Sequence, residues 1–278
     1  MERETRLRET LVAQLGRAGV LRSPAVAAAV RAVPRHLFLP SIHPEEAYAD
    51  QAMALKVSGG EILSSISQPS MIVQMLELLQ ARPGDRILEV GTGSGYNAAL
   101  LAELAGPAGS VTSIELDVEM VERASRTLAR LGYERVRVFG GDGAVASGGE
   151  PAYDRVAITA RCDDVSSTWW DALRDGGRMV IPLRLPAAGE FVVGFERRGD
   201  CLHGIGAHPC AFIALRGENS QAVVDRVFFR DAQRNADSAR VRSIASIEAV
   251  RARDATPQLL EDADVVVARP VTMFGIRF

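Results

Sequence analysis

The sequence predicts an α/β protein with a doubly wound, mostly parallel sheet, antiparallel edge strands and a C-terminal α+β extension. Three observations lead to this fold class. Short apolar runs alternate with amphipathic segments between residues 86 and 181, which is typical of strands joined by helical crossovers. A glycine-rich run directly follows the first of these strands. After residue 190 the apolar runs follow each other with only short turns, as in an antiparallel edge.

Length and composition narrow the class of protein. The 278 residues suffice for one large core without a metal or disulfide. The net charge of −3 excludes a globally basic nucleic-acid binder. No run approaches the ~18 apolar residues of a membrane span. Three cysteines, Cys162, Cys201 and Cys210, without a repeated CxxC motif predict reduced thiols and a cytoplasmic location.

The N-terminal region predicts two helices followed by a loop. Leu7, Leu11 and Leu15 recur at helical spacing, and Ser23-Pro24 has the character of an N-cap followed by a first helical residue, so we expect two helices within residues 5–32. Residues 33–70 have little periodicity and contain several prolines and glycines. This composition predicts a long functional loop.

The remaining elements follow the alternation described above. Strands are expected at 86–90, 110–115, 136–139, 154–158 and 178–181, and helices at 97–105, 118–131 and 167–173. Three further strands are expected at 191–196, 202–205 and 211–215. We therefore expect a domain over residues 1–217, whose first 70 residues are N-terminal helices and a substrate loop. Residues 218–278 form the extension, with a helix at 244–252 and strands at 265–267 and 273–278.

The glycine run Glu89-Val-Gly-Thr-Gly-Ser-Gly95 carries the strongest functional signal. Alternating glycines let the backbone turn tightly and approach a ligand closely. The spacing differs from the G-x-G-x-x-G of dinucleotide-binding loops. A carboxylate at Glu89 repels a pyrophosphate but suits a ligand that carries an ammonium group. An ordinary tight strand–helix turn is the alternative interpretation.

Two more acidic residues follow the next strands. Glu115 ends the second strand, where a carboxylate can accept both hydroxyls of a ribose, and Asp142 follows the third, where it can accept from an adenine amino group. A surface acid and an Asp-Gly turn are the respective alternatives. The carboxyl ends of parallel strands converge on one crevice. The combination resembles the pattern of class I S-adenosylmethionine-dependent methyltransferases.

Further motifs narrow the resemblance to one family. They occur in a fixed order around the glycine run: Val33-Pro-Arg35, Ala47-Tyr48, Ser65-Ile-Ser-Gln-Pro69, Glu89 to Tyr96, Gly141-Asp-Gly143, Tyr153-Asp154 and Gly176 to Pro182. In this order, over about residues 5–217, the chain resembles the protein L-isoaspartyl O-methyltransferase family. That family has a doubly wound sheet with rearranged last strands.

The resemblance implies a complete set of site residues and partners. The cofactor is S-adenosylmethionine, the product is S-adenosylhomocysteine, and no metal is involved. Cofactor-binding residues are expected at Ser65, Ile66, Glu89, Gly91, Thr92, Gly93, Gly95, Glu115, Leu116, Asp142 and Gly143. Substrate-binding residues are expected at Val57, Ser58, Gly59, Gly60, Ala211, Phe212 and Ile213. Ser67 falls at the position of the active-site serine.

The implied chemistry is methyl transfer to a carboxylate of a peptide or protein. A carboxylic acid of pKa ~4 is ionised at neutral pH, so the reaction needs no strong general base. Catalysis then rests on holding oxygen, methyl and sulfur in line at about 3 Å. The hydroxyl of Ser67 could hold the acceptor carboxylate. Alternatively, Ser67 is the N-cap of a helix that begins near Pro69.

Three departures from the family suggest a specialised member. Residues 50–64 are longer and different from the usual Gly-rich stretch, Ala211–Leu215 replaces a proline-containing strand, and the tail after residue 217 is additional. We therefore expect a methyltransferase for an aspartate of a ribosomally made precursor peptide, whose ester closes to a succinimide. A monomer without nucleic-acid or membrane partners is favoured.

Other functions and sites stay open at this point. A nucleic-acid base methyltransferase would be expected to have a basic surface and often an Asn-Pro-Pro-aromatic motif, which residues 159–164 lack. An inactive scaffold would not need the intact glycine run. Cys201, His203, His208 and Cys210 could in principle meet around zinc in a hairpin, although their spacing matches no familiar zinc pattern.

Overall fold

The computed structural model describes residues 2–145, 152–185, 189–217 and 266–268. The helix expected at 244–252 and the strand expected at 273–278 lie outside these residues. Within the extension, the described strand β10 (Val266–Ala268) overlaps the strand expected at 265–267. The division into a domain ending at residue 217 and an extension stays a prediction.

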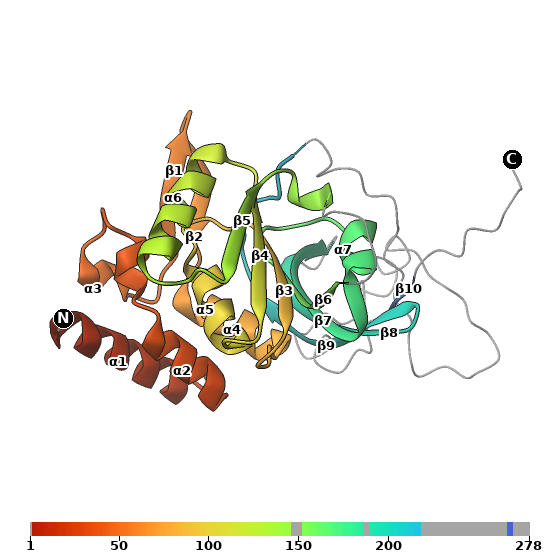
Figure 1. Ribbon diagram of the computed structural model, residues 1–278, viewed down its shortest axis with the longest axis horizontal. Coiled ribbons are helices and arrows are strands. Elements are labelled where there is room, and N and C mark those ends of the chain that lie inside the picture. The colour runs from red at the N-terminus through yellow and green to blue at the C-terminus, as the bar shows by residue number, and fades with distance from the viewer. Residues whose placement is uncertain (1, 146–151, 186–188, 218–265, 269–278) are drawn as a thin grey trace, which may run out of the picture.

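In the described part of the chain, eight strands form one central sheet in the order β10-β9-β8-β7-β6-β3-β4-β5 (Figure 1). The strands are β3 (Arg86–Val90), β4 (Ser110–Glu115), β5 (Val136–Gly140), β6 (Tyr153–Ile158), β7 (Leu173–Leu185), β8 (Gly189–Arg198) and β9 (Cys201–Pro209). Strands β3 to β7 are mutually parallel, while β8, β9 and β10 add on antiparallel. The predicted parallel sheet with an antiparallel edge is confirmed.

Helices cover both faces of the sheet, as a doubly wound fold requires. They are α1 (Glu2–Arg17), α2 (Pro24–Ala32), α4 (Pro69–Leu79), α5 (Tyr96–Ala105), α6 (Val118–Arg130) and α7 (Ser167–Ala172). Successive strand residues point to opposite faces. Accordingly, Ile87 packs in the core with α2, α4 and α5, and Leu88 packs in the core with α7. None of the helices in the described residues is long and apolar enough to cross a membrane.

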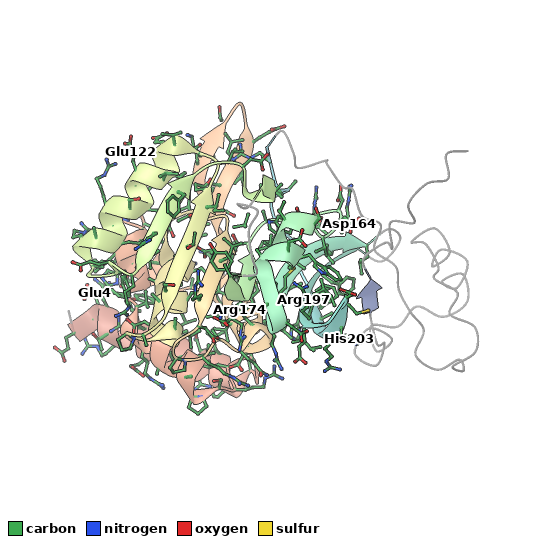
Figure 2. All side chains as sticks on the ribbon, turned by 45° about the vertical axis from the view of Figure 1, so that its right-hand side comes forward. Glu4, Glu122, Asp164, Arg174, Arg197 and His203 are labelled. Atoms are coloured by element: carbon green, nitrogen blue, oxygen red, sulfur yellow. The ribbon has the colours of Figure 1, made fainter. Side chains whose placement is uncertain are left out.

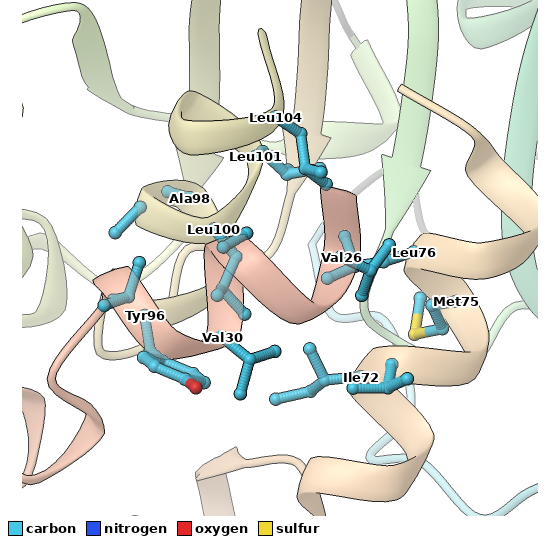
Figure 3. Packing of buried hydrophobic residues seen from close by; sticks show 14 of the residues in the cluster. Val26, Val30, Ile72, Met75, Leu76, Tyr96, Ala98, Leu100, Leu101 and Leu104 are labelled. Atoms are coloured by element: carbon cyan, nitrogen blue, oxygen red, sulfur yellow. The ribbon is translucent and has the colours of Figure 1, made fainter. Parts of the chain in front are cut away.

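The larger core lies where α2, α4 and α5 meet (Figure 3). Val30 of α2, Ile72 of α4 and Leu100 of α5 are all buried there. On the other face, buried Trp169 donates from Nε1 to the Gly143 carbonyl at 2.6 Å. Arg197 of β8, labelled in Figure 2, donates to the Trp170 carbonyl at 2.9 Å and fastens α7 to the antiparallel edge.

The prediction of a loop over residues 33–70 is wrong. This segment contains η1 (Arg35–Phe38), α3 (Pro44–Ala47) and an antiparallel hairpin of β1 (Met53–Ser58) and β2 (Glu61–Ile66). Gly59 and Gly60 form its turn with φ angles of 58° and 84°, the conformation that two-residue hairpin loops favour. Most hairpin side chains are partly or fully exposed, so its apolar residues do not show a clear alternation.

The strand expected at Ala211–Leu215 is also wrong. The chain leaves the sheet at Pro209 and crosses the carboxyl end of β6. Arg161 donates its N–H to the Ile213 carbonyl and accepts from the Leu215 N–H, both at 2.8 Å. The segment thus forms one isolated parallel bridge, Arg161 to Ala214, because its partner lies beyond a strand end.

A buried guanidinium ties the N-terminal segments to each other and to the start of α5. Arg35 is completely buried, donates to the carbonyl of Ala47 at 2.8 Å and to that of Ser67 at 2.9 Å, and lies 5.0 Å from the ring centre of Tyr96. Burial lowers the pKa of Arg35 from its ordinary value. Four of the sequence motifs, including the one that contains Arg35, therefore meet at this side chain.

We predict that Arg35→Met destabilises the protein by about 3 kcal/mol, because two carbonyls lose a charged donor in a dry environment. Urea unfolding followed by circular dichroism measures the change. Arg31→Met is the matched control, since it removes an exposed ion pair with Glu9 and should cost less than about 0.5 kcal/mol. Equal midpoints for the Arg35 variant and the wild type would contradict the prediction.

Candidate active site

The glycine run forms the turn between β3 and α5. Gly91, Gly93 and Gly95 have φ angles of 98°, 53° and 87°, which side chains rarely tolerate. A Cβ atom on Gly91 would lie 2.3 Å from Oγ1 of Thr159, whose hydroxyl donates to the Gly91 carbonyl at 2.7 Å. The loop is therefore shaped by its glycines and held by the end of β6.

Glu89 supports this loop through buried hydrogen bonds. Its carboxylate is fully buried and accepts from Nδ2 of Asn97 at 2.8 Å and from the hydroxyl of Ser113. The oxygen of that hydroxyl lies 2.5 Å from Oγ1 of Thr92 within the loop. Burial raises the pKa of Glu89 to about 7. Its predicted cofactor role stays a prediction, and in this structure the carboxylate positions the loop.

Glu115 lies at the end of the neighbouring strand and is largely buried. Its Oε2 accepts from the Gly93 N–H at 2.9 Å, and its Oε1 accepts from the Asp117 N–H at 3.1 Å. Each carboxylate oxygen can accept a second hydrogen bond. The next residue, Leu116, exposes 40% of its surface. A carboxylate beside an open apolar side chain fits a ribose and its attached base.

Asp142 precedes η2 (Gly143–Val145) and lies close to the same crevice. Its Oδ1 accepts from the Ala144 N–H at 3.0 Å. A Cβ atom on Gly143 would lie 2.3 Å from Cγ1 of Val90, so this turn packs on the end of β3. A Cβ atom on Gly217 would lie 2.6 Å from the Asp142 carboxylate. The segment that crosses β6 therefore ends directly against Asp142.

The hairpin of β1 and β2 lies against the glycine run at Gly93. A Cβ atom on Gly93 would meet Leu55 Cδ1 and the Ser65 carbonyl, both at 3.7 Å, with Ser64 Oγ at 3.8 Å. The missing side chain at Gly93 thus leaves a narrow space between the loop and the hairpin. Ser65, a predicted cofactor residue, borders this space, and Ile66, another, is buried next to it in the chain.

Ser67 follows the hairpin and is half-buried. Within the described part of the chain its hydroxyl makes no hydrogen bond, while its carbonyl accepts from Arg35. The alternative of Ser67 as an N-cap is wrong, because Gln68 is the N-cap of α4 and makes no side-chain cap bond. Asp50 takes that role by accepting from the Ser70 N–H at 2.8 Å, so the Ser67 hydroxyl is left for another partner.

The predicted substrate residues occur in two segments that form one rim. Val57, Ser58, Gly59 and Gly60 occupy the exposed tip of the hairpin, and Ala211, Phe212 and Ile213 lie in the crossing segment. Nη2 of Arg216 donates to the Leu63 carbonyl at 2.8 Å and joins the two segments. Their contact with a substrate stays a prediction.

Several residues that shape the site were missed by sequence reasoning. Thr159, Ser113 and Asn97 support the glycine run but stand outside any motif used above. Arg35 lies within the Val-Pro-Arg motif, which was the available signal. Lys56 is the single lysine of the chain, and its ion pairs are described below.

The zinc hypothesis gains no support from the structure. Over the described residues, no group of three or more His, Cys, Asp or Glu side chains could hold a metal ion.

Cys162, close to the crevice, is buried, and burial raises the pKa of its thiol to about 12. A protonated, buried thiol is a poor nucleophile.

Glu89→Gln tests the buried carboxyl. Because the folded protein holds this proton up to about pH 7 and the unfolded chain releases it near pH 4.5, the group's contribution to stability falls between these values. The glutamine variant has no such loss, so its stability relative to wild type should rise from pH 5 to pH 8, by on the order of 3 kcal/mol in total. Urea unfolding at four pH values measures this, and a pH-independent difference would contradict it.

Comparison with known proteins agrees with the geometry. The family model of protein-L-isoaspartate(D-aspartate) O-methyltransferase matches residues 5–220. Protein-L-isoaspartate O-methyltransferase 2 of Archaeoglobus fulgidus is 39% identical over 217 residues, which are 78% of this chain and 94% of that protein. The protein-L-isoaspartate O-methyltransferase of Methanopyrus kandleri is 43% identical over 218 residues, 77% of this chain and 92% of that protein.

Solved structures show the same fold. A protein-L-isoaspartate O-methyltransferase with 31% identity has a TM-score of 0.69, covering 80% of this chain and 72% of that one. A putative protein-L-isoaspartate O-methyltransferase from Plasmodium falciparum, solved with S-adenosyl-L-homocysteine, is 19% identical with a TM-score of 0.64, covering 75% of this chain and 98% of that one. The nucleic-acid methyltransferase and scaffold alternatives are not favoured. The chain belongs to the protein-L-isoaspartate(D-aspartate) O-methyltransferase family, and the predicted S-adenosylmethionine-dependent O-methyltransferase is confirmed.

Proposed function

We propose that this chain methylates the side-chain-type carboxylate of an aspartyl or isoaspartyl residue in a peptide substrate, using the crevice between the glycine run and the hairpin. The observation that supports this most directly is the position of Gly93 opposite Ser65, whose carbonyl oxygen would lie 3.7 Å from a Cβ atom on Gly93. It places the start of the Ser65–Ser67 segment against the cofactor loop. The predicted catalytic hydroxyl therefore follows the cofactor space by two residues.

Specific residues would hold the cofactor. Glu115 would accept the ribose hydroxyls, Leu116 would lie against the adenine, and Asp142 with Gly143 would receive its amino group. Gly91, Thr92, Gly93 and Gly95, faced by Ser65 and Ile66, would enclose the methionine portion, with Glu89 positioning the loop. When bound, the cofactor supplies an electrophilic methyl group on a sulfonium. The remaining lone pairs of the Glu115 carboxylate fit the ribose hydroxyls of the cofactor. The missing side chain at Gly93 fits its methionine portion.

The protein contributes mainly alignment to the reaction. The acceptor carboxylate is ionised at neutral pH, so no side chain has to remove a proton. The Ser67 hydroxyl would donate a hydrogen bond to one carboxylate oxygen and leave the other oxygen to attack. The hairpin would exclude water, which favours a step in which opposite charges are neutralised.

Ser67→Ala should lower kcat/KM about 10- to 100-fold, because a hydrogen bond to a charged group is worth about 1.5–3 kcal/mol. Initial rates with a peptide acceptor measure this change. The affinity for S-adenosylhomocysteine should change less than twofold. Ser41→Ala, at an exposed site before α3, is the matched control. An unchanged kcat/KM in the Ser67 variant would remove the serine from the proposed mechanism.

We further propose that the enzyme serves one particular peptide, such as a ribosomally made precursor. The rim around the crevice supports this, because residues 50–64 are longer than the usual family stretch and Ala211–Leu215 stands where the family has a proline-containing strand. In the product, the backbone nitrogen after the esterified residue attacks the ester carbonyl, loses its proton, and releases methanol to give a succinimide. Residues 218–278, which follow the rim directly, would recruit the substrate.

Mass spectrometry with matched synthetic peptides tests this specialisation. We expect methyl ester or succinimide on the aspartyl peptide of the cognate sequence, and slower reaction of its isoaspartyl twin. Methylation of the isoaspartyl form alone would defeat the specialised function and leave the family activity intact. The cytoplasmic location, the monomeric state and the lack of a nucleic-acid partner stay predictions from composition.

A further inference from the structure

The hairpin is bound to the far side of the crevice through its only cationic side chain. Lys56 of β1 donates from Nζ to Oδ2 of Asp117 at 2.6 Å and to Oε2 of Glu119 at 2.8 Å. The Asp117 side chain is 17% exposed and that of Glu119 is 77% exposed. Because exposed ion pairs contribute little, Asp117 is the main partner. Figure 1 shows the hairpin beside α6, which begins directly after Asp117.

Asp117 is itself fixed in place by three backbone contacts. Its Oδ1 accepts from the N–H groups of Glu119 at 3.0 Å and Met120 at 3.4 Å, so it caps α6. Its own N–H donates to Oε1 of Glu115 at 3.1 Å. Lys56 therefore binds the N-cap residue of α6. This residue also contacts Glu115, whose carboxylate is proposed to bind the ribose.

These contacts close a circuit around the proposed cofactor space. From Lys56 the circuit passes through Asp117 to Glu115, and from Glu115 to the Gly93 N–H at 2.9 Å. Gly93 faces Leu55 and Ser65 of the hairpin, which returns the circuit to the residue next to Lys56. A ligand held at Glu115 and Gly93 would therefore lie beside the hairpin whose position Lys56 fixes.

We propose that Lys56 is a positioning residue that latches the hairpin over the cofactor, and that breaking its pair with Asp117 opens the exit path. The proposal rests on the cofactor site described under the proposed function. The latch is ionic, because Lys56 joins β1 to the carboxylates of Asp117 and Glu119 at the start of α6. Release of the cofactor product should therefore depend on Lys56 and on ionic strength.

The direct test measures the dissociation rate constant of S-adenosylhomocysteine from the full chain by stopped-flow displacement. Lys56→Met keeps the aliphatic stem and removes the charge, and should raise the rate constant about fivefold, the equivalent of an ion pair of about 1 kcal/mol. Lys56→Arg should restore most of the slow release. Arg126→Met, which removes an exposed ion pair with Glu122 on the same helix, should leave it unchanged.

A double-mutant cycle assigns the effect to the pair. Asn is as good an N-cap as Asp, so Asp117→Asn removes the charge without uncapping α6 and should accelerate release as Lys56→Met does. Adding both changes should give little more than either alone. Raising the salt concentration should accelerate release from wild type and leave Lys56→Met nearly unaffected, because salt screens the pair.

Chemical labelling gives a readout independent of catalysis. Since the chain has a single lysine, an amine-reactive ester labels only Lys56 and the N-terminus, which peptide mapping separates. Saturating S-adenosylhomocysteine should slow acylation of Lys56 several-fold and leave the N-terminus unchanged. Tight binding with identical dissociation in wild type and Lys56→Met, or unprotected Lys56, would overturn the latch. A wild type that does not bind the ligand would instead overturn the proposed cofactor site.

Discussion

The geometry of the crevice depends on the contacts of the buried Arg35 guanidinium. Taking a cation out of water costs several kcal/mol, so the buried guanidinium depends on the hydrogen bonds that its Nε and Nη2 donate. Its acceptors are backbone carbonyls of Ala47 and Ser67, and its flat face lies near the ring of Tyr96. The N-terminal segments, the proposed catalytic serine and the first turn of α5 are thereby held in one arrangement. Displacing any of these segments would remove a partner of the buried charge.

The two carboxylates of the crevice show how neighbouring strands give one residue type two functions. Glu89 is enclosed by Asn97 and Ser113, so burial raises its pKa and its oxygens support the glycine run from inside. Among the described residues, Glu115 accepts from two backbone N–H groups, which leaves each oxygen able to accept a second hydrogen bond. The environments differ because Glu89 lies within β3, whereas Glu115 is the last residue of β4.

The rim of the crevice is built from parts outside the main sheet. The hairpin and the segment around Ala214 are joined by Arg216, and Gly217 ends against Asp142. Loops and appended elements can change while the sheet that positions the cofactor residues stays the same. We therefore propose that the rim selects the substrate and that the carboxyl ends of the strands hold the cofactor for methyl transfer.

The amino-acid sequence by itself determined the parallel strands, their helices and the glycine turn, because apolar periodicity and glycine conformations are local properties. It also placed Glu89, Glu115 and Asp142 at strand ends, which meet in any sheet of this topology. The hairpin was locally encoded by Gly59-Gly60 but hidden by its exposed faces. Only the tertiary structure decided that Lys56 meets Asp117, 61 residues away, that Arg35 finds the Ser67 carbonyl, and that residues 211–215 bridge to Arg161. Such pairings depend on the distance between elements after packing, and no periodic pattern along the chain records that distance.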